Sequence, residues 1–71
     1  MTEIDYKAIG LRLTTIRQRL GLDVREAAKV AGVTMRSWRK WERGRPSRTG
    51  SILKICRAFD CSIDWLVTGR A

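Results

Sequence analysis

The chain has 71 residues, and its 15 lysines and arginines against 7 acidic residues give it a formal net charge of +8. A chain of this length forms one domain, and its small core leaves little room for the walled pocket of an enzyme. Eleven of the 15 cations are arginine, which forms paired hydrogen bonds with phosphate or guanine better than lysine does. The charge therefore favours a polyanionic partner; a well-solvated surface is the alternative.

The sequence contains two cysteines, Cys56 and Cys61, and no histidine. A zinc site needs four nitrogen or sulfur ligands, so we expect no metal and no cofactor. Cys56 falls at helical spacing with Ile52 and Phe59, which favours the core over a nucleophile, and we do not expect an enzyme. No apolar run approaches the roughly 20 residues of a membrane span, and the N-terminus lacks a signal-peptide pattern. We therefore expect a cytoplasmic location, prokaryotic or in the host of a phage, and no membrane partner.

Helical periodicity recurs along the chain, and no segment alternates like a half-buried strand. The first predicted helix covers about 5–20 and ends before Gly21, and its apolar face consists of Ile9, Leu13, Ile16 and Leu20. Asp23 and Glu26 have the spacing of a capping box, which predicts a helix over 24–31.

Thr34 is a suitable N-cap for a third helix over 35–43. Only Val33 and Thr34 separate Gly32 from this helix, so the two helices must cross at a steep angle. This geometry is that of a helix-turn-helix, here within about 23–44. Two further helices are predicted over 50–59 and, after Ser62, over 63–67, which makes the fold class all-α, a compact bundle of five helices.

Within this motif, Ala28 is small where the two helices approach, and Gly32 allows a positive φ in the turn. Trp38 and Trp41 are three residues apart, and both are expected to point into the core. The opposite face of the third helix then carries Met35 and four cations: Arg36, Arg39, Lys40 and Arg43.

Several short motifs follow one another between about Ile9 and Gly69, namely Ile16-Arg17, Gly21-Leu22, Ala28, Gly32-Val33, Trp41-Glu42-Arg43-Gly44 and Ser62-Ile63-Asp64-Trp65-Leu66. In this order they resemble the lambdoid phage repressor and Cro family of helix-turn-helix proteins, the XRE type. The resemblance implies a lambda-repressor-like fold that binds double-stranded DNA with the helix over 35–43 in the major groove.

Carried over by position, the resemblance implies that bases are read by Met35, Arg36, Arg39 and Lys40. An arginine there can bind guanine through two hydrogen bonds, whereas methionine can only touch a thymine methyl group. Contact with phosphate alone is the alternative for the three cations. Phosphate contacts are expected from the edges of the motif: Val24, Arg25, Thr34, Ser37, Arg43, Arg45, Ser47 and Arg48. Val24 stands where the family often has glutamine, so only main-chain N–H groups can bind phosphate there. For Arg48 the alternative is a place in a solvated loop.

The remaining positions of the resemblance are expected to be structural. Arg17 resembles an arginine that pairs with the glutamate ending the recognition helix, here Glu42. Ala28, Gly32, Trp38 and Trp41 belong to the same group. Trp38 is larger than the aliphatic residue usual in the family, and we expect its indole to fill the space that Ala27 and Ala31 leave.

The function predicted from the sequence is a DNA-binding transcription regulator, a homodimeric repressor or autoregulator that reads a palindromic operator. No ligand-binding domain follows Ala71 in this sequence, so we expect control by concentration, competition or a protein partner. Ile63, Trp65 and Val67 are the candidate dimer surface, and a Trp65 inside the core is the alternative. A DNA-binding antitoxin or a restriction-modification controller fits equally well, and a module that binds no DNA fits less well with cations on the reading helix.

Overall fold

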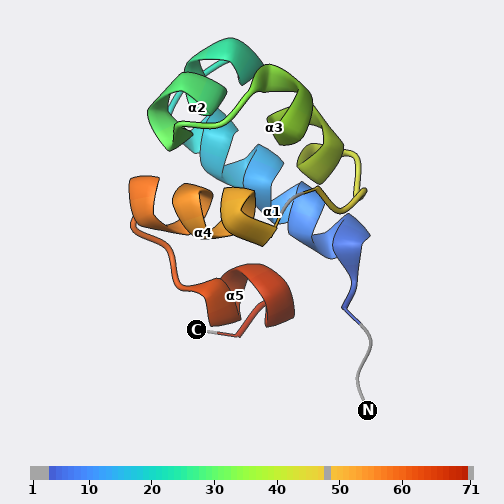
Figure 1. Cartoon of the computed structure of the whole chain (residues 1–71). Helices are drawn as coiled ribbons and strands as arrows, with labels where there is room; N and C mark the ends of the chain where they lie inside the picture. Colours follow the sequence, from blue (N-terminus) through green and yellow to red (C-terminus); the bar gives the residue numbers. More distant parts are fainter. Residues whose placement is uncertain (1–3, 48, 71) are drawn as a thin grey trace.

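The computed structural model of the chain describes residues 4–47 and 49–70, which form five helices and no strand (Figure 1). The helices are α1 (Tyr6–Arg19), α2 (Val24–Ala31), α3 (Met35–Glu42), α4 (Thr49–Ala58) and α5 (Ile63–Thr68). The predicted all-α class and the five-helix arrangement are confirmed. None of these helices combines the length and apolar character needed to cross a bilayer.

The helix starts follow from short polar side chains that bind free main-chain N–H groups. Asp5 lies outside α1 as its N-cap, and its carboxylate accepts the N–H of Ala8 at 3.1 Å, so the helix begins one residue later than expected. At α2 the capping box is present: the N–H of Glu26 binds Asp23 Oδ1 at 2.7 Å, and the N–H of Asp23 binds Glu26 Oε1 at 3.0 Å. Thr34 and Ser62 cap α3 and α5 in the same way.

The helix ends differ from expectation by one residue in several places. α1 ends at Arg19 with Leu20 as its C-cap, and α3 ends at Glu42 with Arg43 as its C-cap. α4 covers 49–58 instead of 50–59. Its end is closed by Asp60, the only residue other than glycine with a positive φ (50°) in the described ranges, and by a hydrogen bond of 3.0 Å from the N–H of Cys61 to the carbonyl of Cys56.

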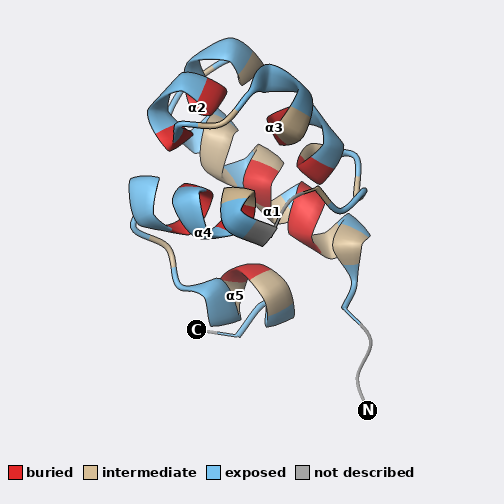
Figure 2. Ribbon diagram, in the orientation of Figure 1, coloured by how far each residue is buried: buried red, intermediate tan, exposed pale blue. Residues whose placement is uncertain are grey.

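The core is formed by inward faces of all five helices (Figure 2). α1 contacts α3 and α5, α2 contacts α3 and α4, and α4 contacts α5. Trp38 is fully buried in the same cluster as Ala27 and Ala31, and its ring centroid lies 5.7 Å from that of Phe59. Cys56 is also buried, and burial raises the pKa of its thiol to about 12. A thiol with so high a pKa is protonated at neutral pH, which agrees with a packing role.

Candidate nucleic-acid interface

α3 presents an aromatic face to the core and a cationic face to solvent. Trp38 and Trp41 are 0% and 4% exposed, which is the inward placement expected from their spacing. The four predicted base-reading residues are exposed on the opposite side of the helix: Met35, Arg36, Arg39 and Lys40. The helix therefore offers cations that are available to a ligand, on a support that is fixed by buried indole rings.

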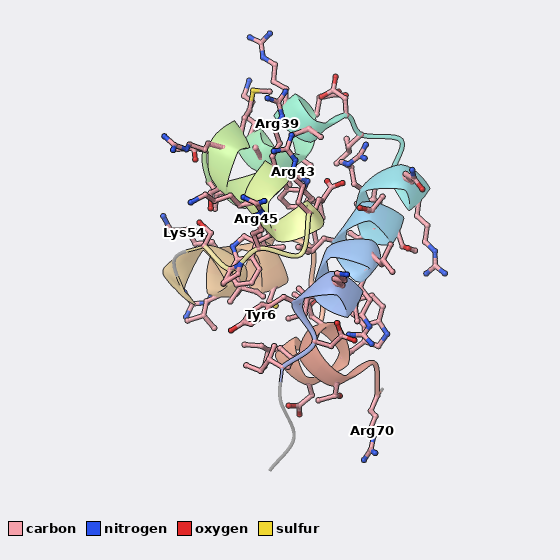
Figure 3. The ribbon with its side chains drawn as sticks, turned by 90° about the vertical axis from the view of Figure 1, so that its right-hand side faces the viewer. Tyr6, Arg39, Arg43, Arg45, Lys54 and Arg70 are labelled. Carbon is pink, nitrogen blue, oxygen red and sulfur yellow. The ribbon has the colours of Figure 1, made fainter. Side chains whose placement is uncertain are left out.

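The cationic face continues past the end of α3. Arg43 and Arg45 are exposed and line one open hollow together with the four base-reading residues. Figure 3 shows Arg39, Arg43 and Arg45 following one another along α3 and the next loop. No carboxylate lines this hollow within the described part of the chain. Its charge is therefore positive throughout, as a polyanion requires.

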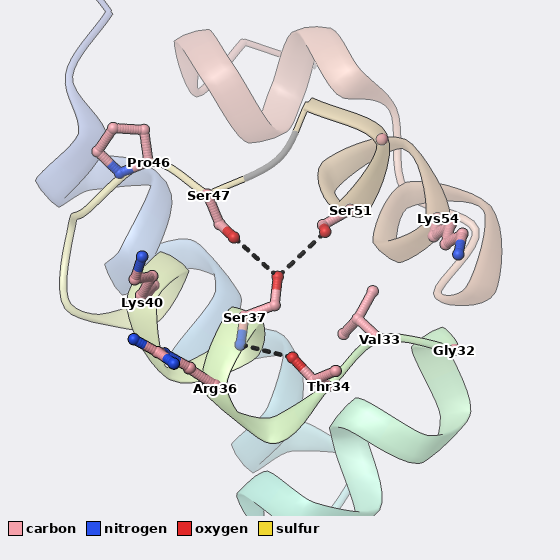
Figure 4. A pocket seen from close by; sticks show the side chains of 11 residues that line it. Gly32, Val33, Thr34, Arg36, Ser37, Lys40, Pro46, Ser47, Ser51 and Lys54 are labelled. Atoms are coloured by element: carbon pink, nitrogen blue, oxygen red, sulfur yellow. Dashed lines mark hydrogen bonds between the residues drawn. The ribbon is translucent and has the colours of Figure 1, made fainter.

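A second hollow lies between α3 and the first turns of α4, and a cluster of three serine hydroxyls lies beside it (Figure 4). Ser37 donates its hydroxyl hydrogen to Ser51 Oγ at 3.0 Å and contacts Ser47 Oγ at 3.0 Å. A hydroxyl group has one hydrogen, so Ser47 is the donor in the second bond. The hydroxyl hydrogens of Ser37 and Ser47, both expected at phosphate, are thus used inside the protein, because the loop folds back onto α3.

The carboxylate of Glu42 fixes α3 to α1. It receives Arg17 Nε at 2.8 Å and Arg17 Nη2 at 3.2 Å, which is the ion pair implied by the family resemblance. Two further donors reach it, Thr14 Oγ1 at 2.7 Å and the indole Nε1 of Trp38. The side chains of Arg17 and Glu42 are only 18% and 13% exposed, so solvent screens the pair less than it would on an open surface.

These contacts change the titration of the pair. Burial raises the pKa of Glu42, but hydrogen bonds from Arg17, Thr14 and Trp38 outweigh it, and the net pKa lies below the ordinary value of 4.5. The hydrogen bond to Glu42 also raises the pKa of Arg17. Glu42 is therefore ionised at neutral pH and occupied by donors from α1 and α3, which keeps its charge away from the cationic face.

Gly10 allows α1 and the end of α3 to approach closely. A Cβ atom at position 10 would lie 2.7 Å from the carbonyl oxygen of Trp41 and closer still to that of Glu42. Carbon atoms do not approach oxygen this closely without displacement of the main chain, so only glycine fits. Position 10 was not recognised in the sequence, because a glycine inside a helical pattern does not show what it faces.

The first turn of α2 has main-chain N–H groups that its capping box does not use. Its capping box uses the N–H groups of Asp23 and Glu26, which leaves those of Val24 and Arg25 at the open end of the helix. The Val24 side chain is half-buried and that of Arg25 is exposed. Thr34 Oγ1 accepts the N–H of Ser37 at 3.0 Å, so this oxygen caps the start of α3. Arg48 lies outside the described residues.

The candidate dimer residues do not share one environment. Ile63 is exposed, whereas Trp65 and Val67 are half-buried and pack against the core. Arg12 of α1 donates hydrogen bonds to the carbonyl oxygens of Leu66 at 2.9 Å and Val67 at 3.3 Å, which hold the end of α5 against α1.

Among the described residues, no group of three or more potential ligands is arranged for a metal ion.

Three further residues near the site, Thr14, Ser51 and Lys54, were not predicted from the sequence. Thr14 binds Glu42, and Ser51 and Lys54 line the hollow between α3 and α4. That Ser51 and Lys54 lie on one face of a helix could be predicted from the sequence, because residues three positions apart are neighbours on a helix surface. That this face lies beside α3 could not be predicted.

Residues 8–69, most of the chain, match the family described as helix-turn-helix domain. The chain belongs to the helix-turn-helix domain family. The five-helix arrangement agrees with this, and so does the XRE-type resemblance found in the sequence. An HTH_3 family transcriptional regulator from Vibrio cholerae superposes on this helix-turn-helix protein with a TM-score of 0.75 at 25% identity, over 87% of this chain and 35% of that one. The chain thus spans about a third of that regulator.

Two structures of the clp gene regulator ClgR from Corynebacterium glutamicum have the same fold as this helix-turn-helix protein. One has a TM-score of 0.71 at 26% identity, over 90% of this chain and 69% of that one. The other has a TM-score of 0.73 at 24% identity, over 93% of this chain and 86% of that one.

Proposed function

We propose that this helix-turn-helix protein is a transcription regulator that binds double-stranded DNA at specific sequences. The observation that supports the proposal is the construction of α3: its cationic face is open, and its opposite face is held by two buried tryptophans and by Glu42. The family and its fold, shared with solved transcription regulators, support the same function. Bacterial DNA, or phage DNA in a bacterial host, is then the target, which agrees with a cytoplasmic location.

In the proposed complex α3 lies in the major groove, with Arg36 and Arg39 toward base edges and Met35 and Lys40 beside them. A guanidinium group that binds guanine O6 and N7 contributes about 1–3 kcal/mol of discrimination against the wrong base. Phosphates on either side of the groove are bound by Arg25, Arg43 and Arg45 and by the open end of α2. This division separates the residues that select a sequence from those that add affinity for any duplex.

The protein acts as a homodimer in this proposal, as a repressor or an autoregulator. A single short helix reads only a few base pairs, and two copies one DNA turn apart read a palindrome. The surface proposed for the dimer consists of Ile63 and the outer parts of Trp65 and Val67, because Ile63 is the exposed apolar residue of α5.

Selection of bound sequences from a random duplex pool tests the proposal. We expect a palindromic consensus with guanines in each half-site and a mass of two protein chains per duplex by light scattering. A consensus without a repeat would exclude the palindromic dimer but keep specific DNA binding. Enrichment of no sequence over the starting pool at moderate ionic strength would contradict specific DNA binding and leave an interaction module.

A further inference from the structure

The hollow between α3 and α4 has a chemistry that the helix-turn-helix alone does not explain. Its described lining carries three cations, Arg36 and Lys40 from α3 and Lys54 from α4, and no carboxylate. The hydroxyls of Ser37, Ser47 and Ser51 fix the wall where α3, the loop and α4 meet. Lys54 is exposed, and Figure 4 shows it on the α4 side of this hollow, across from Arg36 and Lys40.

Two hollows therefore flank one row of cations. Arg36 and Lys40 line both of them, with Arg39, Arg43 and Arg45 on one side and Lys54 on the other. A helix in the major groove has a sugar-phosphate backbone on each side, because the groove is bounded by the two strands. Lys54 lies on one side of this row and Arg43 and Arg45 lie on the other, so in a major groove the two groups would face different strands.

We propose, on the basis of the function proposed above, that the hollow between α3 and α4 receives a backbone phosphate and that Lys54 contacts it. This adds a contact on α4, outside the helix-turn-helix, to the DNA-binding surface. Lys54 lies on α4 and not on the base-reading face of α3, and its ammonium group is a point charge that can bind a phosphate. Ser37 does not contact the phosphate in this proposal. Its hydrogen bonds to Ser47 and Ser51 hold the loop and α4 in place beside α3, and so keep the hollow open.

Salt titration of Lys54→Ala tests this contact, with fluorescence anisotropy on a selected duplex and on a mixed-sequence duplex of the same length. Each phosphate that a cation neutralises contributes about 0.9 to the slope of log K against log salt. We expect Lys54→Ala to reduce the slope by about this amount on both duplexes, and Lys54→Arg to restore it. Arg57→Ala is the matched control, because Arg57 is exposed on the same helix but does not line the hollow.

Three results would overturn the inference: an unchanged slope for Lys54→Ala, an equal loss for Arg57→Ala, or a loss on the selected duplex alone. The second would mean that only net charge matters, and the third that Lys54 reads a base. In each of these cases the wild-type protein still binds its selected duplex, so the proposed function stands. If the wild-type protein instead prefers no duplex, that result contradicts the proposed function, and with it the proposed contact of Lys54.

Discussion

The indole N–H of Trp38 donates a hydrogen bond to the carboxylate of Glu42, one turn further along α3. Trp38 thus has two functions: its ring fills the core beside Phe59, and its N–H fixes the carboxylate that Arg17 and Thr14 also bind. The side chain that we expected to fill space in the core is thus also part of the polar network that orients α3.

Replacement of Trp38 separates these two functions. Trp38→Ala removes a fully buried ring and should cost about 3–5 kcal/mol, enough to unfold a domain of this size at physiological temperature. Trp38→Phe keeps most of the ring and removes a donor to Glu42, which should cost about 1–3 kcal/mol. Thermal unfolding followed by circular dichroism measures both. A folded Trp38→Ala variant with unchanged DNA affinity would contradict this account.

Trp41→Phe is the matched control for Trp38→Phe. Trp41 is also buried, but its Nε1 has no hydrogen-bond partner among the described residues. Removing an unpaired buried donor costs no hydrogen bond, so the loss in stability should be smaller than for Trp38→Phe. Equal losses for the two variants would show that ring size alone, and not the contact with Glu42, determines the effect.

Acid should weaken the attachment of α3 to α1. The pKa of Glu42 is lower in the folded protein than its ordinary value of 4.5, so its contribution to stability is present above about pH 4.5 and is lost as the pH falls through the folded pKa. Glu42→Gln, which carries no titratable group, should lose stability at neutral pH and show a weaker pH dependence below pH 4.5. Chemical unfolding at a series of pH values measures this, and an unchanged pH profile would argue against the network.

Gly10→Ala should destabilise the protein although alanine is the better helix former. The added Cβ meets the carbonyl oxygens of Trp41 and Glu42, so the end of α3 must move away from α1. We expect an overpacking loss of about 1–3 kcal/mol and weaker DNA binding. Gly50→Ala is the control, since a Cβ there meets nothing within 4 Å in a helical position, and it should gain up to about 1 kcal/mol. Denaturant midpoints should therefore shift in opposite directions.

Arg36 and Arg45 should differ in what their removal changes. Arg36→Ala is expected to relax the preference at one base position of each half-site, with a cost of about 1–3 kcal/mol on the preferred duplex. Arg45→Ala, at the loop beyond α3, is expected to weaken all duplexes by a similar factor. Repeated selection with each variant measures the two effects. The reverse result would mean that Arg45 reads a base and that Arg36 binds phosphate.

Arg12→Ala should release the end of α5. The guanidinium of Arg12 satisfies the carbonyl oxygens of Leu66 and Val67, which are among the groups that a helix C-terminus leaves free. Amide hydrogen exchange in α5 should become faster, while exchange in α2 and α3 changes little. Arg19→Ala, an exposed cation at the end of the same α1 helix, should leave α5 unaffected.

The local features of this protein were predictable from the sequence. The capping box of Asp23 and Glu26, the caps Thr34 and Ser62 and the left-handed Gly32 all depend on residues at most a few positions apart. The inward direction of Trp38 and Trp41 follows from helical periodicity in the same way. Periodicity and capping therefore determined where α2 and α3 begin and which face of α3 carries the cations.

The contacts that orient α3 were decided by tertiary structure. Thr14 meets Glu42 across 28 positions of sequence, and Arg17 meets it across 25; Gly10 faces α3 only because the helices cross there. The resemblance to a family supplied the Arg17 pair, but not Thr14, Gly10 or Lys54. Such partners depend on crossing angles and loop paths, which result from packing of the whole core and leave no periodic signal in the residues themselves.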